Sequence, residues 1–120
     1  MKENNIIKEK SFKFSVRILK LFRHLRDSKV KRELFSQLLK SGTSIGANIE
    51  EAIGASSRKD FVAKLAISYR EARERNYWLR LLKEGNLLDE KLAESFLIDC
   101  TELQKILSTI INLFKQPLNS

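Results

Sequence analysis

The chain contains almost nothing that would interrupt a helix. Its 120 residues include only 4 Gly and 1 Pro, too few turn formers for a sandwich or barrel of many short strands. Hydrophobic residues make up 42% of the chain, which is too many for a disordered protein. The sequence therefore predicts one nearly all-helical domain over residues 1–120, with short flexible ends at about residues 1–9 and 117–120.

Apolar residues recur at helical spacing in four segments. We expect helices over about residues 11–26, 30–55, 58–84 and 90–115. The last segment has the most regular pattern, because its apolar positions alternate steps of four and three along one seam. These positions are Phe96, Cys100, Leu103, Leu107, Ile110 and Phe114.

Local signals mark where the predicted helices begin and end. Ser57 followed by Asp60 predicts a capped N-terminus for the third helix, Asp89 an N-cap for the fourth, and Gly85 the stop between them. Because the predicted connections are short, neighbouring helices should be antiparallel. The expected fold class is all-α, an antiparallel up-down-up-down four-helix bundle.

The second helical segment contains a stretch of small residues, Ser-Gly-Thr-Ser-Ile-Gly-Ala-Asn, at positions 41–48. Glycine disfavours helix by about 1 kcal/mol relative to alanine, so this stretch could be a loop. It could equally be a helical surface that lets a neighbouring helix come close. The apolar spacing continues in phase from Leu38 to Ile45, Ile49 and Ile53, which favours one continuous helix.

The first helical segment is apolar on two sides and basic on the third. One apolar stripe contains Phe14, Ile18 and Leu21, and the other contains Phe12, Val16 and Leu19. Two apolar stripes are more than one small bundle usually covers.

Basic residues are concentrated at the start of the chain. The formal net charge is +8, and residues 1–32 alone hold 11 Lys and Arg against 3 Asp and Glu. Lys13, Arg17 and Lys20 share one helical stripe, with Arg23 and Arg26 beside it. The face could simply be solvated, or it could bind a polyanion. If the face binds a polyanion, the contacts would be mostly to phosphates, so binding would be weakly sequence-specific and strongly salt-dependent.

Few residues suit catalysis or metal binding. The chain has one Cys and one His, and the Glu-x-x-His motif of di-iron bundles is absent because Leu21 stands three residues before His24. Acids that could face the core are Glu50, Glu51, Glu71 and Glu74, but Glu71–Arg75 and Arg70–Glu74 have the spacing of surface ion pairs. Cys100 lies on the apolar seam and is expected to be buried. We expect no enzyme, no metal and no cofactor.

Three aromatic residues of the third segment could act as stacking platforms for bases: Tyr69, Tyr77 and Trp78. Tyr69 and Trp78 lie on apolar faces, which favours packing for these two. The uninterrupted apolar runs are far too short to span a membrane, and the first residues lack the pattern of a signal peptide. The expected location is the cytoplasm.

Three stretches of the sequence together resemble a known family. They are Ser-Phe-Lys-Phe-Ser-Val-Arg-Ile at 11–18, the segment at 37–51 that includes Ser-Gly-Thr-Ser-Ile-Gly-Ala-Asn, and the segment at 59–79 that includes Glu-Ala-Arg-Glu and Tyr-Trp-Leu. The chain resembles the bacterial four-helix bundle proteins encoded within intervening sequences of 23S ribosomal RNA genes. That family includes the accessory variability determinant protein of diversity-generating retroelements.

The resemblance implies a bundle that assembles into a barrel-like homopentamer, with the small-residue stretch inside a helix. In the retroelement branch it implies a basic barrel that binds nucleic acid and a reverse transcriptase. The second apolar stripe, Phe12, Val16 and Leu19, then becomes a candidate subunit contact.

Two functions remain open from the sequence. The first is a non-enzymatic oligomeric protein that binds RNA or an RNA/DNA hybrid through Lys13, Arg17, Lys20, Arg23 and Arg26. The alternative is a scaffold or adaptor whose basic face docks an acidic partner, such as a nucleic-acid-processing enzyme. No membrane partner is expected.

Overall fold

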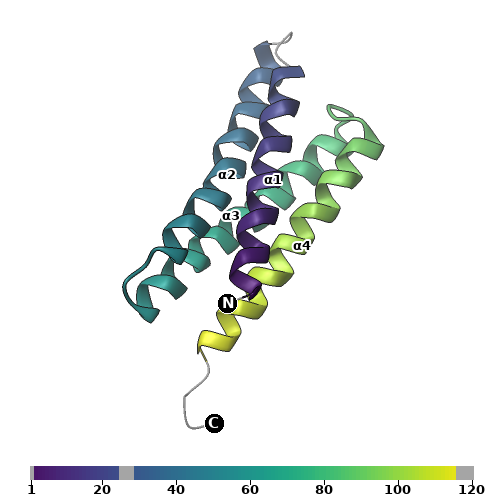
Figure 1. Cartoon of the computed structure of the whole chain (residues 1–120). Coiled ribbons are helices and arrows are strands. Elements are labelled where there is room, and N and C mark those ends of the chain that lie inside the picture. Colours follow the sequence, from purple (N-terminus) through teal and green to yellow (C-terminus); the bar gives the residue numbers. More distant parts are fainter. Residues whose placement is uncertain (1, 25–28, 116–120) are drawn as a thin grey trace.

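The structure, a computed structural model, is a bundle of four helices (Figure 1). It describes the backbone of residues 2–24 and 29–115, and within these ranges all side chains except those of residues 2, 3, 24, 29–32, 35, 41 and 42. The helices are α1 (Lys2–His24), α2 (Lys29–Ile53), α3 (Arg58–Glu84) and α4 (Glu90–Lys115). The described residues contain no strand, so the predicted fold class is confirmed.

Each helix packs against the next one in the sequence, and α1 also packs against α4. Among the described residues, the diagonal pairs α1–α3 and α2–α4 have no such contact. The bundle is elongated, 54 × 23 × 20 Å. Figure 1 shows the α1–α2 hairpin crossing the α3–α4 hairpin, with their upper ends lying apart. None of the described helices is long and apolar enough to cross a membrane.

The predicted seam of α4 forms one wall of the core. Phe96, Cys100, Leu103, Leu107 and Ile110 are all buried. The last seam residue, Phe114, is only partly buried and packs against Phe61 with ring centroids 4.9 Å apart. Alternating steps of four and three keep one face of a helix against its neighbours, so the pattern identified the core side of α4 correctly.

The first helix begins at Lys2, nine residues before the predicted start. Residues 2–9, expected to be part of a flexible end, are helical in the structure, while residue 1 and residues 117–120 lie outside the described part. Ile7 and Ser11 are buried and extend the stripe of Phe14 in steps of four and three. A single apolar residue ahead of the stripe is a weak sequence signal, but its burial stabilises two more helical turns.

The small-residue stretch of α2 lies inside a continuous helix, as the apolar spacing predicted. A Cβ atom added to Gly46 would lie 3.2 Å from the Ser15 Oγ atom and 3.5 Å from the Ser11 carbonyl oxygen. The backbone of α2 therefore comes close to α1 at this glycine. The helix tolerates Gly46 because the missing side chain makes room for the crossing.

The predicted N-caps are confirmed. The Asp60 amide donates to the Ser57 hydroxyl at 3.1 Å, and the Leu92 amide donates to the Asp89 carboxylate at 3.1 Å. Each side chain satisfies an amide of the first helical turn that has no partner within its helix.

The end of α3 differs from prediction by one residue. Gly85 has φ −81°, whereas Asn86 has φ 58°. The Leu87 amide donates to the Leu82 carbonyl at 2.9 Å, and the Asn86 amide donates to the Lys83 carbonyl at 3.1 Å. This is a Schellman motif with Asn86, not Gly85, in the left-handed position.

An Asn86→Gly variant should therefore be more stable than the natural protein, by roughly 0.5–1 kcal/mol, since glycine adopts positive φ without a Cβ penalty. Urea unfolding followed by circular dichroism would measure the gain. Gly85→Ala is the matched comparison for the free energy of unfolding. Gly85 has a negative φ, so any gain from alanine there comes from its better helix propensity and not from relief of a left-handed conformation. A loss of stability in Asn86→Gly would contradict the left-handed assignment.

Candidate nucleic-acid interface

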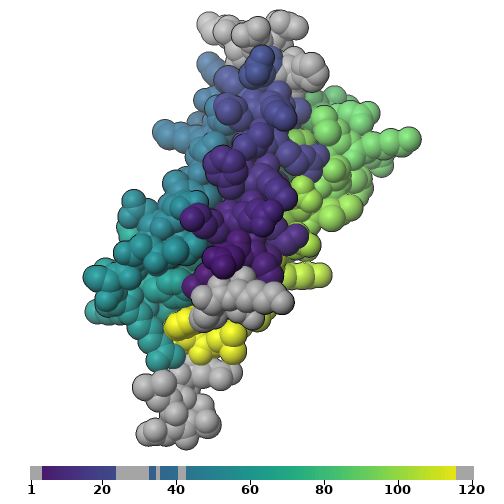
Figure 2. All heavy atoms as spheres, viewed as in Figure 1, coloured from purple at the N-terminus to yellow at the C-terminus, as the bar shows by residue number. Residues whose placement is uncertain are grey.

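The outer side of α1 runs along one face of the molecule, between α2 and α4 (Figure 2). Of the predicted binding residues, Lys13, Lys20 and Arg23 are exposed on this helix. Lys20 and Arg23 form no ion pair with any carboxylate in the described part of the chain. Arg26 lies outside the described residues. The structure thus brings three of the five predicted cations to the surface of one helix.

Arg17 has a different position from Lys13, Lys20 and Arg23. Its Nη1 atom contacts the Asp99 carboxylate at 2.5 Å, and its Nη2 atom donates to the Ser95 hydroxyl at 3.0 Å. The guanidinium also lies 4.1 Å from the centroid of the Phe96 ring. An ion pair combined with a cation–π contact holds a side chain in one orientation. Arg17 therefore fastens α1 to α4 and leaves little of its charge for a ligand.

Carboxylates from distant parts of the sequence neutralise much of the positive charge on the N-terminal half of α1. Lys8 pairs with Glu50 of α2 at 3.7 Å, and Lys10 pairs with Glu102 of α4 at 2.9 Å. The hydrogen bond to Glu102 raises the pKa of Lys10. The count over residues 1–32 found few compensating acids because these partners lie on other helices.

Lys13 pairs with Glu9 one turn earlier in α1, at 3.0 Å. The hydrogen bond from Lys13 is the largest cause that lowers the pKa of Glu9. Both side chains are largely exposed, so this ion pair contributes little stability. A phosphate could therefore displace Glu9 from Lys13 at a small cost in free energy.

The second apolar stripe of α1 is exposed in the single chain. Phe12 is 64% and Leu19 is 49% exposed, and Val16 is partly buried. Beside Phe12, a groove of about 370 Å³ runs between α1 and α2. Its lining is mostly small: Ser11, Phe12, Ser15, Thr43, Gly46, Ala47 and Glu50. Of the three residues predicted for a subunit contact, Phe12 therefore lines this groove.

The predicted ion pairs of α3 are absent among the described residues. Arg70 and Glu74 are both exposed and do not pair, and Arg75 is buried instead of meeting Glu71 at the surface. None of the three guanidinium nitrogens of Arg75 has a hydrogen-bond partner in the described part of the protein. Burial lowers the pKa of Arg75 to about 10. The spacing rule failed because Arg75 shares the core-facing side of α3 with Ala72 and Leu79.

The thiol of Cys100 is buried, as its seam position predicted. It donates to the Ala72 carbonyl of α3 at 3.1 Å. Burial raises the pKa of Cys100 to about 12, so the thiol is protonated at neutral pH. No three His, Cys, Asp or Glu of the described residues lie close enough to hold a metal ion.

A set of exposed basic side chains on α3 was not predicted from the sequence. Arg70, Arg73 and Arg80 are exposed, and none of them forms an ion pair with a described residue. The net charge did not reveal these arginines, because residues 33–120 hold as many acidic as basic residues. Their spacing of three and seven residues, which places them on one helical face, was the signal that could have found them.

Comparison with known proteins agrees with the resemblance seen in the sequence. The profile of the 23S rRNA-intervening sequence protein family matches residues 3–109. A crystal structure of a protein with unknown function from the S23 ribosomal protein family of Bacteroides thetaiotaomicron is 44% identical. The two folds superpose with a TM-score of 0.87, over 92% of this chain and 98% of that chain. No curated protein matches.

Proposed function

The chain belongs to the 23S rRNA-intervening sequence protein family, and on that premise we propose that it is a non-enzymatic, oligomeric protein that binds nucleic acid through the outer face of α1. One observation carries the proposal. Lys20 and Arg23 are exposed on α1 and have no carboxylate partner among the described residues. Unpaired cations on a rigid helix attract phosphates without first having to break an ion pair.

The predicted residues divide into two roles. Lys13, Lys20 and Arg23 contact phosphates, together with the predicted Arg26, while Arg17 positions the helix by holding Asp99 and Ser95 of α4. Phosphate contacts carry little sequence information. The expected ligand is therefore chosen by its charge and shape. A cytoplasmic location is part of the same proposal.

Self-assembly is the second part of the proposal. Phe12, Val16 and Leu19 face away from the core of their own chain, and burying them against another copy would remove apolar surface from water. The family resemblance suggests a ring of five copies. Such a ring would repeat the α1 face around its circumference, so a modest charge on each chain would become a large local field.

Charge reversal at the unpaired positions tests the binding. Lys20→Glu/Arg23→Glu should weaken binding of a fluorescein-labelled RNA hairpin at least tenfold in an anisotropy titration. The slope of log K against log salt should also become shallower, by about 1.8 for two lost contacts to a duplex. Arg17 is left unchanged, because reversing it would break the contact to Asp99 and disturb the fold.

Lys40→Glu/Lys91→Glu is the matched control, since both residues are exposed elsewhere and the net charge changes equally. This control should bind nearly as well as the natural protein. Equal losses in the two variants would refute a specific α1 face. A protein partner that stays bound after nuclease treatment, when the purified chain does not bind RNA, would support the acidic-partner alternative.

The assembly is tested separately by sedimentation equilibrium. Val16→Asp/Leu19→Asp should reduce the mass from that of an oligomer towards the 13.9 kDa of one chain, because carboxylates cannot be buried at an apolar contact without a large desolvation cost. Leu81→Asp changes another exposed apolar residue and serves as the control. An unchanged mass in the double variant would remove this stripe from the interface.

A further inference from the structure

A shallow groove runs along α3 and α4, and the described part of α1 does not contact the α3 wall of this groove. It consists of three adjoining depressions of about 530, 640 and 470 Å³. The first two share Tyr69 and Ser108, the first and third share Gln104, and the second and third share Arg70. The depressions are therefore continuous. No Cα atom of α1 lies within 8 Å of α3 among the described residues.

The lining of the groove is basic. It includes five cationic side chains, Arg70, Arg73, Arg80, Lys105 and Lys115, and one carboxylate, Glu74. A further depression, which shares Thr101 and Lys105 with the first, adds Glu94 and Glu102 at its edge. The three arginines follow one face of α3 and span ten residues, or about 15 Å at the helical rise of 1.5 Å per residue. That length is enough for two or three successive phosphates of an extended strand.

Aromatic rings alternate with these cations. Tyr77 lies on the same stripe as Arg73 and Arg80 and is 53% exposed. The Arg80 guanidinium is 5.9 Å from the Tyr77 ring centroid, and the Trp78 ring meets the Tyr77 ring nearly edge-on at 6.0 Å. Contacts of this kind hold an exposed ring in place, which lowers the entropy cost of stacking a base on it.

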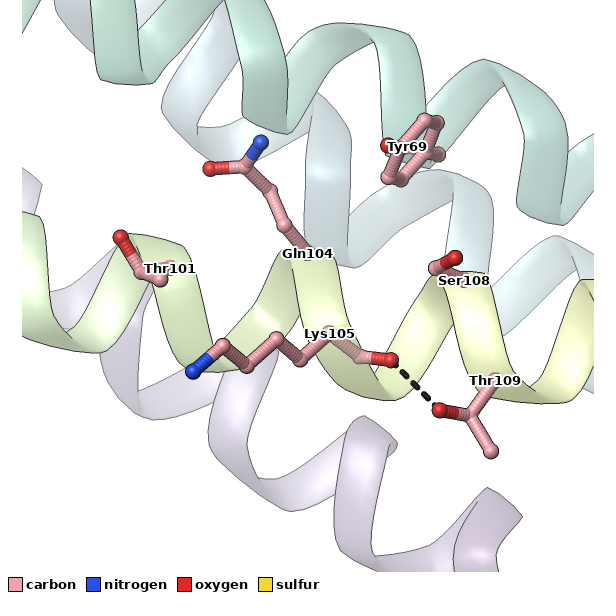
Figure 3. A pocket seen from close by; sticks show the side chains of 6 residues that line it. All are labelled: Tyr69, Thr101, Gln104, Lys105, Ser108 and Thr109. Carbon is pink, nitrogen blue, oxygen red and sulfur yellow. Dashed lines mark hydrogen bonds between the residues drawn. The ribbon is translucent and has the colours of Figure 1, made fainter.

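The middle of the groove supplies a second ring and neutral polar groups (Figure 3). Tyr69 projects from α3 towards α4, and Gln104 projects from α4 towards α3. Thr101 and Ser108 lie on the same side of α4 as Gln104. Amide and hydroxyl groups can donate to and accept from the edges of bases that are not paired.

We propose that the α3–α4 groove binds single-stranded nucleic acid, with phosphates on Arg70, Arg73 and Arg80 and a base stacked on Tyr77. A duplex would satisfy only the charges, because its base faces and Watson–Crick edges are occupied. An acidic protein would likewise leave Tyr77 and the polar centre of the groove unused. The combination of cations, an exposed ring and hydrogen-bonding groups therefore favours a single strand. This site lies on other helices than the α1 face and does not depend on it.

The test compares a fluorescein-labelled 15-nucleotide oligo(U) with the RNA hairpin in anisotropy titrations of the full chain. Arg73→Glu/Arg80→Glu should weaken oligo(U) binding at least tenfold and make its salt slope shallower by about 1.4, as two lost phosphate contacts require for a single strand. Tyr77→Ala should weaken it at least fivefold. Tyr77→Phe keeps the ring and should bind within twofold of the natural protein.

The matched control for net charge is Lys40→Glu/Lys91→Glu, which should leave oligo(U) affinity within threefold. The loss caused by Arg73→Glu/Arg80→Glu should exceed the loss caused by Lys20→Glu/Arg23→Glu, which removes phosphate contacts of the α1 face only. Circular dichroism of each variant checks the helical fold. Oligo(U) binding that survives both groove variants, or that only the α1 variant abolishes, would overturn the inference while leaving the proposed α1 interface intact. Competition by poly-glutamate at equal charge concentration would also overturn it, because the groove would then recognise charge alone.

Discussion

Replacing Arg75 with methionine is expected to raise the free energy of unfolding by about 1–4 kcal/mol. The Arg75 side chain is completely buried, and none of its three nitrogens has a hydrogen-bond partner among the described residues. A buried charge without a partner loses its hydration and gains little in return. Methionine has a similar length and flexibility and fills irregular apolar space well, so it removes the cost without opening a large cavity.

Thermal and urea unfolding followed by circular dichroism would measure this gain. The melting temperature should rise by roughly 4 °C for each kcal/mol in a domain of this size. Arg75→Lys is the matched control, because it keeps the buried charge and should bring no comparable gain. A clear loss of stability in Arg75→Met would show that the guanidinium has acceptors in solution that satisfy it.

The pH dependence of the free energy of unfolding is a second test of Arg75→Met. Burial holds the pKa of Arg75 near 10 in the folded protein, below its value in the unfolded chain. Above about pH 10 the unfolded chain therefore binds more protons at this site than the folded protein does. The natural protein gains stability there relative to Arg75→Met. The difference between the two proteins should be constant below pH 9 and should shrink as the pH rises through 10.

Arg75 also shows what the sequence could not predict. Helical periodicity and caps are local properties, and they located α2, α3 and α4 to within about two residues. The partner of a charged side chain is a tertiary property. The i, i+4 spacing of Glu71 and Arg75 suggested a surface pair, but the rotation of α3 about its axis, set by packing, turned Arg75 into the core.

The same distinction explains the basic face of α1. Counting charges along the chain predicted a basic face with few compensating acids within residues 1–32. In the folded protein Asp99 and Glu102 of α4 reach Arg17 and Lys10, and only the C-terminal half of the described α1 surface keeps unpaired cations. A charge count over a short segment cannot detect ion pairs whose two residues lie 80 or more positions apart in the sequence. Among the described residues, the unpaired cations of the proposed interface are therefore Lys20 and Arg23, with Lys13 at its edge.

Gly46→Leu is expected to destabilise the bundle by about 3 kcal/mol, the upper end of the usual cost of overpacking. A Cβ atom at this position would lie 3.2 Å from the Ser15 hydroxyl oxygen and 3.5 Å from the Ser11 carbonyl oxygen. A leucine side chain extends well beyond its Cβ atom, and the Ser11 carbonyl belongs to a helix backbone that cannot rotate aside. The two helices would have to move apart.

Gly46→Ala is the matched control. Its Cβ atom meets chiefly the Ser15 hydroxyl, which can turn to another rotamer at a modest cost, and alanine favours helix over glycine by about 1 kcal/mol. We expect Gly46→Ala to unfold within about 1 kcal/mol of the natural protein, while Gly46→Leu unfolds at clearly lower urea. Hydrogen exchange should show faster opening of α1 in Gly46→Leu, because α1 loses its close contact with α2 at this residue. Equal stability of the two variants would mean that α1 and α2 do not cross closely at Gly46.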